Sequence, residues 1–211
     1  MLGKFTPMLV RVFLFILFAL SQVPGWAQEQ SNWQLELEEG DVRVYLKAEE
    51  GADMSVRVTT TTASTAAQVK SVIDAVESYP EWVHRCAEAY RVPGGTPDEY
   101  VYYSRINLPF PFSDREVVAR ITQTWDASTR TLSRSISAEP DAVVRNDNYN
   151  RMEAYEAEWK ITDLPDGRVS ITCICRTAAG AGLPAWLRKD ILAGGPAQTM
   201  QNLVDRLAAR R

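Results

Sequence analysis

The side chains best suited to catalysis are few. His84 is the only histidine among 211 residues, so the sequence excludes a metal site built from several histidines. His84 and Cys86 could serve as base and nucleophile, but two residues of one segment give no evidence of catalytic geometry. The sequence contains no P-loop, no Gly-x-Ser-x-Gly elbow and no dinucleotide-binding turn. It therefore predicts no catalytic residue, no metal site and no cofactor.

Cysteine chemistry is limited by number. Cys86, Cys173 and Cys175 allow at most one internal disulfide. On a strand, Cys173 and Cys175 share a face with Val169 and Ile171, which favours small buried apolar side chains over metal or redox chemistry. Whether Cys86 forms a disulfide stays open.

One arginine lies in line with apolar residues on a predicted strand. Its face of the strand is shared by Val117, Ala119 and Ile121. Arg115 precedes this row by two residues, so its side chain points the same way. A buried arginine is costly without an anionic partner. The partner is either a bound anion, which makes Arg115 a candidate ligand-binding residue, or a neighbouring carboxylate, Asp114 or Glu116.

Residues 151–161 offer a second candidate wall for a binding site. Alternation places six side chains on one face: Arg151, Glu153, Tyr155, Ala157, Trp159 and Ile161. Arg151 and Glu153 could pair there, which would make their burial less costly. The alternative is that this face belongs to an exposed edge of the sheet. We take Arg151, Glu153, Tyr155 and Trp159 as candidate ligand-binding residues.

A third row mixes polar and aromatic side chains. It consists of Tyr103, Arg105 and Asn107. Alternation alone does not decide whether this row faces inward or whether the opposite row of Tyr102, Ser104 and Ile106 does. Tyr103 and Arg105 are kept as candidate ligand-binding residues.

The elements that must position these residues are strands in the middle of the chain and helices near its ends. Period-two patterns predict strands near 35–38, 41–48, 54–62, 99–108, 115–125, 131–137, 150–161 and 168–177. Helical spacing over 65–76 follows Ser64, a possible N-cap. The turn 163–168 is typical of a hairpin. Consecutive strands with helices outside them indicate an α+β fold with an antiparallel sheet.

The chain ends in an apolar helix with a weak point. Pro184 suits a first helical turn. An apolar stripe recurs at three- and four-residue steps: Leu183, Trp186, Leu187, Ile191, Met200, Leu203, Val204 and Leu207. Gly194, Gly195 and Pro196 interrupt it. The stripe could close over a binding space, or it could belong to an ordinary core helix with a kink.

The N-terminus is typical of an export signal. Lys4 and Arg11 supply positive charge, residues 12–20 form a short apolar core, and small residues end at Ala27. We expect a signal peptide over 1–27, one domain over 28–211, and a periplasmic or secreted protein. An uncleaved anchor or a buried helix is the alternative. The chain carries 23 basic and 27 acidic side chains, a net charge of −4, which argues against nucleic acid as a partner.

Four segments in order along the chain carry a family resemblance. They are "YPEWVHRCAEAYRV" (79–92), "LPFPFSDREVV" (108–118), "RMEAYEAEWKI" (151–161) and "AGLPAWLRKDILAGGPAQTMQNLVDRL" (181–207). Together they resemble START domains, the steroidogenic-acute-regulatory-related lipid-transfer family. The similarity extends over residues 40–208. Glu116 stands where the family usually has aspartate, which is a departure.

The resemblance implies a helix-grip fold, in which a curved antiparallel sheet wraps a long C-terminal helix and encloses a hydrophobic tunnel. It implies that this helix acts as a gate, with Leu183, Trp186, Leu187, Ile191, Gly194 and Gly195 as the residues concerned. Arg115 matches an arginine near the head group in phospholipid-carrying members. Glu88 matches an acidic position of sterol-binding members, but its partner position holds Ile121, which argues against simple transfer of sterol specificity.

The function expected is non-enzymatic binding, and transfer, of a single lipid or other hydrophobic molecule. Burial alone supplies the affinity, since each buried methylene contributes about 0.8 kcal/mol. We expect a monomer with transient membrane contact. An aromatase or cyclase acting on a polyketide, from the same superfamily, is the enzymatic alternative, and a structural or partner-binding role is a third.

Overall fold

The computed structural model describes residues 32–49, 54–177 and 182–210. The expected signal peptide, residues 1–27, lies outside the described residues. Residues 33–211 form one compact unit, and the fold described below belongs to it. Among the described residues, no helix is both long and apolar enough to cross a membrane.

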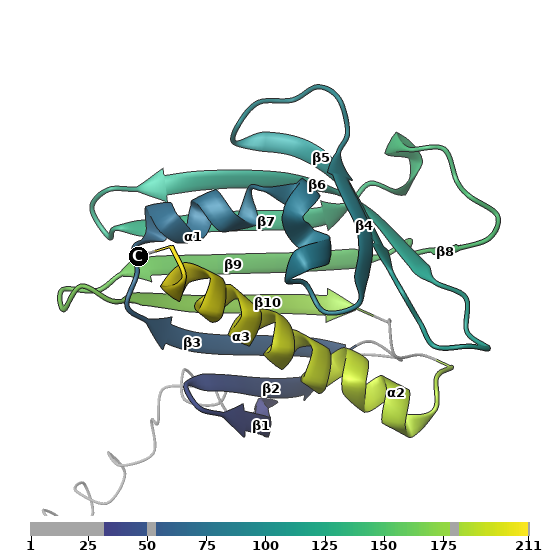
Figure 1. The fold of residues 1–211 in the computed structure, drawn as a ribbon, viewed down its shortest axis with the longest axis horizontal. Helices are drawn as coiled ribbons and strands as arrows, with labels where there is room; N and C mark the ends of the chain where they lie inside the picture. The colour runs from purple at the N-terminus through teal and green to yellow at the C-terminus, as the bar shows by residue number, and fades with distance from the viewer. Residues whose placement is uncertain (1–31, 50–53, 178–181, 211) are drawn as a thin grey trace, which may run out of the picture. The chain divides into compact units, whose positions relative to one another are not determined.

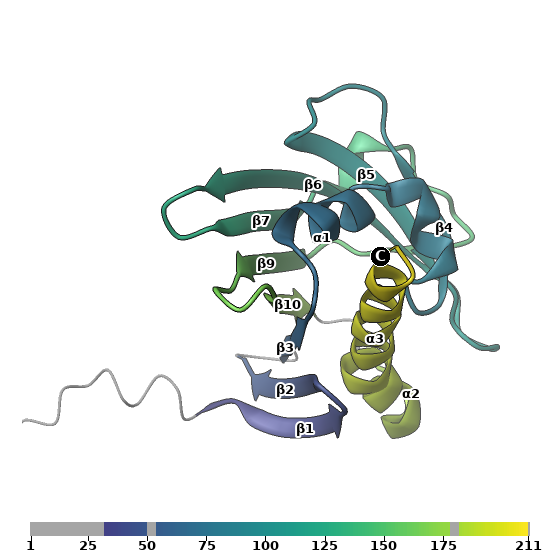
Figure 2. The ribbon, with the colours of Figure 1, turned by 60° about the vertical axis from the view of Figure 1, so that its left-hand side comes forward.

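One large sheet dominates the unit (Figure 1). Its strands are β1 (Gln34–Glu39), β2 (Val42–Ala48), β3 (Met54–Thr62), β4 (Cys86–Arg91), β5 (Glu99–Ile106), β6 (Arg115–Asp126), β7 (Thr131–Ala138), β8 (Asn150–Arg151), β9 (Tyr155–Asp163) and β10 (Val169–Thr177). The order across the sheet is β1-β2-β3-β10-β9-β7-β6-β5-β4, with every neighbouring pair on this path antiparallel. Figure 2 shows the curvature of the sheet around the C-terminal helix. The expected α+β helix-grip architecture is confirmed.

Local sequence accounts for the hairpins. β9 and β10 pair without a register shift from Tyr155 opposite Thr177 to Asp163 opposite Val169. The turn between them contains Gly167 with a φ of 78°, a conformation that glycine adopts without steric cost. The hairpin predicted at 163–168 is therefore confirmed.

The first helix is α1 (Ala66–Ile73), followed by a 3-10 turn η3 (Val76–Glu81). Thr65, and not the expected Ser64, is the N-cap, because its side chain accepts a hydrogen bond from the backbone N–H of Gln68. The Gln68 side chain bonds back to the Thr65 backbone N–H at 3.0 Å and completes a capping box. The buried face of α1 packs into the core with Val69, Val72 and Ile73.

The C-terminal helix is continuous across the glycines. It consists of α2 (Ala185–Lys189), a π-helical turn η5 (Asp190–Gly194) and α3 (Gly195–Ala208). Gly194 and Gly195 keep right-handed helical dihedrals. The helix therefore continues through the two glycines, with one wider, π-helical turn before Gly195. The helix lies across the concave face of the sheet (Figures 1 and 2). It buries Leu187, Leu192, Ala197, Met200, Leu203 and Leu207.

One predicted strand is divided in two. Residues 150–161 were expected to be continuous, but β8 ends at Arg151 and β9 begins at Tyr155. β8 pairs in parallel with the first residues of β6, whereas β9 pairs with β7 and β10. The chain must cross from one neighbour to another over residues 152–154. This crossing ends the alternation on which the faces of Arg151 and Glu153 were assigned.

Candidate ligand-binding cavity

A cavity of about 290 Å³ lies between the concave face of the sheet and the C-terminal helix. Its sheet wall includes Val58, Tyr102, Ser104, Ile106, Val117, Arg134, Ile136, Tyr155, Trp159, Cys173 and Cys175. Its other wall includes Trp82, Val83, His84 and Arg85 from the segment before β4, together with Asp190, Ile191, Gly195, Pro196, Thr199 and Met200 from the helix. Most of these groups are apolar, so the cavity suits a hydrophobic molecule.

On β5, the cavity-facing row is Tyr102, Ser104 and Ile106. The opposite row, which contains the candidates Tyr103 and Arg105, does not line the cavity. Tyr103 is buried and its ring stacks on that of Tyr90 at 4.8 Å between centroids. Arg105 Nη1 donates to Asp114 Oδ2 at 2.7 Å.

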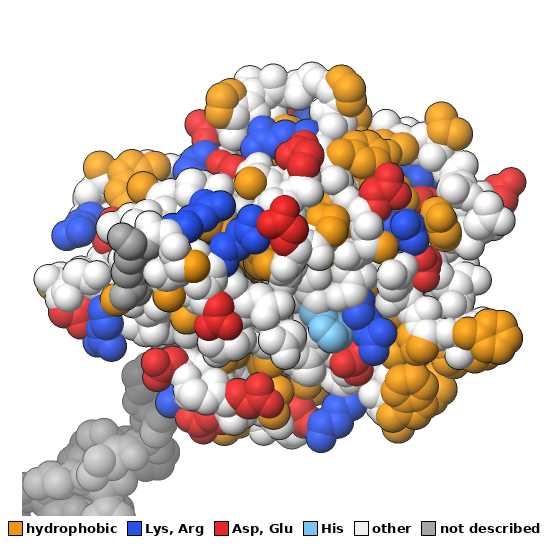
Figure 3. Space-filling model, viewed as in Figure 1, with side chains coloured by type: hydrophobic (Ala, Val, Ile, Leu, Met, Phe, Trp, Pro, Cys, Tyr) orange, Lys and Arg blue, Asp and Glu red, His pale blue; other side chains and the backbone are white. Residues whose placement is uncertain are grey.

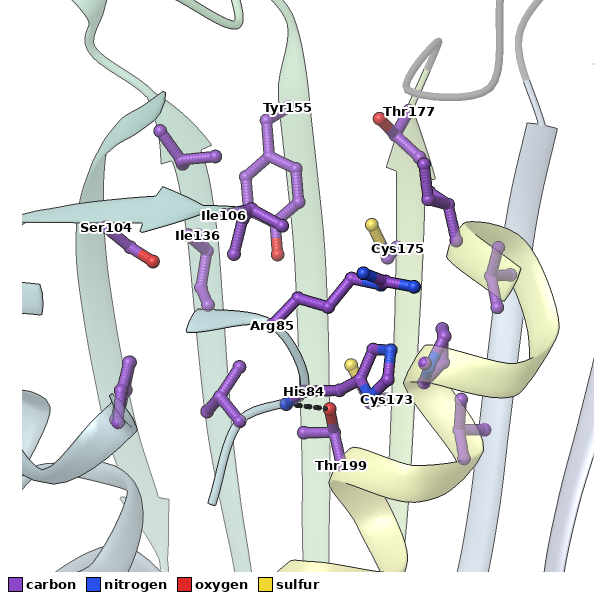
Figure 4. Close-up of a pocket in the computed structure, with 18 of the residues that line it drawn as sticks. His84, Arg85, Ser104, Ile106, Ile136, Tyr155, Cys173, Cys175, Thr177 and Thr199 are labelled. Carbon is purple, nitrogen blue, oxygen red and sulfur yellow. Dashed lines mark hydrogen bonds between the residues drawn. The ribbon is translucent and has the colours of Figure 1, made fainter. Parts of the chain in front are cut away.

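β9 and β10 form the middle of the sheet wall. Tyr155 and Trp159 line the cavity as placed by sequence, and Cys173 and Cys175 line it from the adjacent strand. Figure 4 shows the two sulfur atoms and the Tyr155 hydroxyl in this space. Burial raises the pKa of the Cys173 thiol well above its ordinary value and raises the pKa of the Cys175 thiol to about 12. All three cysteines are free thiols, so Cys86 forms no disulfide.

Arg115 lines the cavity as a half-buried side chain. Among the described residues it has no ion pair and no side-chain hydrogen bond, and its Nε is buried without a partner. The two neighbouring carboxylates are used elsewhere, since Asp114 binds Arg105 and Glu116 binds Arg151. Burial alone lowers the pKa of Arg115. Within the described chain, neither Asp114 nor Glu116 is therefore the partner of Arg115. The positive charge of Arg115 faces the cavity without a counter-ion from this part of the chain.

Arg151 and Glu153 lie away from the cavity lining and do not pair with each other. Arg151 Nε donates to Glu116 Oε1 at 2.8 Å, and both side chains are almost fully buried. Glu153 is exposed and pairs with Arg145 at 2.5 Å. The expected Arg151–Glu153 pair is therefore corrected, because the break at 152–154 turns the two side chains to different environments. Met152, between them, lines the cavity.

The helix wall is fastened to the segment before β4. Arg85 Nε donates to Asp190 Oδ2 at 2.8 Å, and His84 Nε2 lies 3.5 Å from Asp190 Oδ1. The backbone N–H of His84 donates to Thr199 Oγ1 at 3.1 Å (Figure 4). These contacts close one side of the cavity, so opening it there requires that the helix separate from residues 84–85.

The six residues assigned to a gate have different environments. Ile191 and Gly195 line the cavity. Leu187 is fully buried, while Leu183 and Gly194 are half-buried. Trp186 is 59% exposed. A Cβ on Gly195 would lie 2.9 Å from His84 Cδ2, so this glycine permits close approach of the helix to His84.

A buried polar network at Arg134 was not anticipated. Arg134 is 2% exposed, lines the cavity and pairs with Asp74 at 2.7 Å. Its guanidinium also donates to the hydroxyls of Tyr79 and Tyr100. A signal existed in the sequence, because Arg134 alternates with Leu132 and Ile136, both buried. Because its charge is paired, this arginine differs from Arg115.

Hydrophobic side chains are also exposed outside the cavity. Phe110, in the β5–β6 loop, is 97% exposed, and Trp186, in α2, is 59% exposed. Figure 3 shows a group of hydrophobic side chains at the lower right of that face, the corner where Figure 1 places the β5–β6 loop and the start of α2.

A curved antiparallel sheet closed by a long C-terminal helix over an apolar cavity defines a helix-grip protein. The sequence matches the START domain family over residues 15–210, and the chain belongs to that family. An uncharacterised protein of Pseudomonas aeruginosa is 27% identical over 173 residues, which make up 82% of this chain and 85% of that protein.

Two solved structures share the fold. A STAR-related lipid transfer protein from Xanthomonas axonopodis superposes with a TM-score of 0.74 at 20% identity, covering 84% of this chain and 99% of that one. Human StAR-related lipid transfer protein 5 gives a TM-score of 0.71 at 14% identity, covering 87% and 91%.

Proposed function

We propose that this protein binds one hydrophobic molecule with an anionic group, without a covalent step, in the cavity between sheet and helix. The main support is the way in which charged side chains pair around the apolar cavity. Of the arginines and carboxylates that line the cavity, Arg85 pairs with Asp190 and Arg134 pairs with Asp74. Among the described residues, Arg115 is left without such a partner, and a ligand anion would compensate it.

The chemistry of the lining supports binding over catalysis. The cavity thiols are held protonated by their raised pKa values, and the thiolate is the nucleophilic form of cysteine. The His84 ring faces Asp190, with Nε2 3.5 Å from Asp190 Oδ1, and the bond to Thr199 comes from the His84 backbone N–H. The cyclase alternative is tested by incubation with aromatic polyketides. Recovery of unchanged ligand agrees with binding, and a converted product would contradict it.

The proposal includes exchange of the ligand at membranes by a monomer, with the C-terminal helix as the gate. The names of the two solved relatives refer to lipid transfer, and this chain shares their fold. The exposed Phe110 and Trp186 give the surface an apolar contact with a bilayer. Export to the periplasm or the medium, directed by residues 1–27, is part of the same proposal.

Native mass spectrometry of protein purified from its own host tests the binding function and identifies the ligand after extraction. Val117→Phe fills the cavity from β6 and should remove the bound mass. Thr122→Phe, at an exposed position of the same strand, is the matched control and should retain it. Retention of the mass by Val117→Phe would place the ligand elsewhere.

Arg115→Leu tests the anionic group. The variant should bind fatty acids about tenfold more weakly, the scale of one charge-assisted hydrogen bond. Its melting temperature should change little, because no protein partner is lost. Equal loss of binding and stability would instead indicate a structural role for Arg115.

A further inference from the structure

Besides Arg115 and the Trp82 ring nitrogen, which is buried without a partner among the described residues, the cavity wall carries a tyrosine hydroxyl that no group of the described chain binds. Tyr102 lines the cavity and is 6% exposed. Among the described residues, nothing forms a hydrogen bond with its hydroxyl. Two nearby tyrosines differ, since Tyr79 donates to Ile73 O at 2.6 Å and Tyr100 donates to Asp74 Oδ1 at 3.1 Å. Because Tyr102 lines the cavity and no described protein group binds its hydroxyl, this hydroxyl is available to a ligand.

The surroundings keep this hydroxyl in its neutral form. Burial is the largest cause that raises the pKa of Tyr102 above its ordinary value. The group therefore remains both a donor and an acceptor. A ligand hydroxyl or carbonyl can bond to it, whereas a plain hydrocarbon leaves it unsatisfied.

The sheet register gives the backbone separation of Tyr102 and Arg115. Tyr102 lies opposite Ala119 on β6, and Arg115 lies opposite Ile106 on β5. The two positions are four residues apart along the strands, or about 13 Å at roughly 3.4 Å per residue. Between them, Ser104 and Val117 lie opposite each other and line the cavity, and Ser104 Oγ lies 3.6 Å from Cys86 Sγ. The wall thus presents Tyr102 and Arg115, two polar groups without a partner in the described chain, on either side of the partnered Ser104 and of Val117.

We infer that the ligand carries a second oxygen, as a hydroxyl or keto group, at a distance from its anionic group on the scale of this backbone separation of about 13 Å, and that the Tyr102 hydroxyl binds it. The inference rests on the proposed function, in which Arg115 holds the anion. An extended chain covers this distance with on the order of ten carbons, given C–C bonds of about 1.5 Å. The volume of 290 Å³ matches about ten water-sized groups. The ligand class is therefore an oxygenated medium-chain carboxylic acid.

Isothermal titration of two acids tests the inference with the purified protein. Decanoic acid carries only the anion, and 10-hydroxydecanoic acid adds an oxygen at the far end. Tyr102→Phe should weaken binding of the hydroxy acid about 5- to 10-fold, the effect of one neutral hydrogen bond, and should leave decanoic acid unchanged. The 12-carbon pair, dodecanoic and 12-hydroxydodecanoic acid, is measured alongside to locate the second oxygen.

Tyr100→Phe is the matched control. The Tyr100 hydroxyl bonds to Asp74 and Arg134 and does not line the cavity. This variant should lower the melting temperature and keep the wild-type ratio of the two affinities. Tyr102→Phe should leave the melting temperature of the ligand-free protein unchanged, because no hydrogen bond within the described part of the protein is lost.

The outcomes separate this inference from the proposed function. Equal weakening of both acids by Tyr102→Phe, or no weakening of either, overturns the Tyr102 subsite while the binding function stands. Failure of the wild-type protein to bind any of the four acids overturns the anionic ligand of the proposed function, and the inference with it.

Discussion

At the residue scale, the buried ion pair of Glu116 and Arg151 predicts how much stability is lost when one partner is removed. Glu116 is 1% exposed and binds Arg151 at 2.8 Å. Glu116→Ala leaves Arg151 buried without its counter-ion, which we expect to cost about 3–5 kcal/mol of unfolding free energy. Urea denaturation measures the change. Glu153→Ala, which removes an exposed partner of Arg145, is the control and should have no measurable effect.

The raised pKa values of the cavity thiols predict that the stability of the fold depends on pH. Burial raises the pKa of Cys175 from its ordinary value of 9.0 to about 12. Between these values the folded protein holds a proton that the unfolded chain has released, so stability falls as the pH rises through this window. Denaturation at pH 9 to 12 should show a shallower decline for Cys175→Val. Rapid alkylation of Cys175 in the folded protein at pH 9 would contradict the raised pKa.

At the element scale, the adjacent glycines of the C-terminal helix should respond differently to alanine. A Cβ on Gly194 meets Asp190 Oδ1 at 3.5 Å, an ordinary contact, whereas a Cβ on Gly195 meets His84 Cδ2 at 2.9 Å. Gly194→Ala should therefore stabilise the protein by about 0.5–1 kcal/mol. Gly195→Ala should destabilise it by about 1–3 kcal/mol through overpacking. Thermal unfolding of both variants measures the contrast.

The same pair tests the gate. If the helix opens at its π-helical turn, a stiffer Gly194→Ala helix should release ligand more slowly at unchanged equilibrium affinity. Stopped-flow transfer of a fluorescent fatty acid to vesicles measures the rate. A rate equal to that of the wild-type protein would mean that the turn serves packing against His84 and not opening.

At the scale of the whole molecule, the exposed apolar side chains should govern delivery to membranes. Phe110→Ala combined with Trp186→Ala should slow transfer to vesicles severalfold, because fewer apolar groups enter the bilayer. Ligand occupancy measured by native mass spectrometry should not change, since neither residue lines the cavity. Unchanged transfer would argue for release into water before membrane contact.

Export is a second prediction at this scale. The charged start, the apolar core and the small residues before Gln28 predict cleavage after Ala27. N-terminal sequencing of the exported protein should begin at or near Gln28. An intact Met1 on protein recovered from the cytoplasm would contradict it.

Local sequence patterns were sufficient for the α+β class and for most elements, but they missed β4 (Cys86–Arg91), and the helix-grip architecture was expected from the family resemblance. Period-two and helical spacing are local properties of the chain, and they located the hairpin of β9 and β10, the terminal helix and the α+β class. They also placed Arg115, Tyr155 and Trp159 on the cavity side. The same alternation on β7 would have revealed Arg134. Patterns of this kind persist because each face of a strand has one environment along its length.

Other assignments depended on the assembled fold. Alternation on β5 left open which row of side chains faces inward. Tyr102 faces the cavity instead of Tyr103 because the helix packs against that side of the sheet. The partner of Arg151 followed from a break at 152–154, where the chain moves from β6 to β7 and β10. The position of Gly195 against His84 joins segments over one hundred residues apart. Such contacts form only when distant elements pack, so no local pattern contains them.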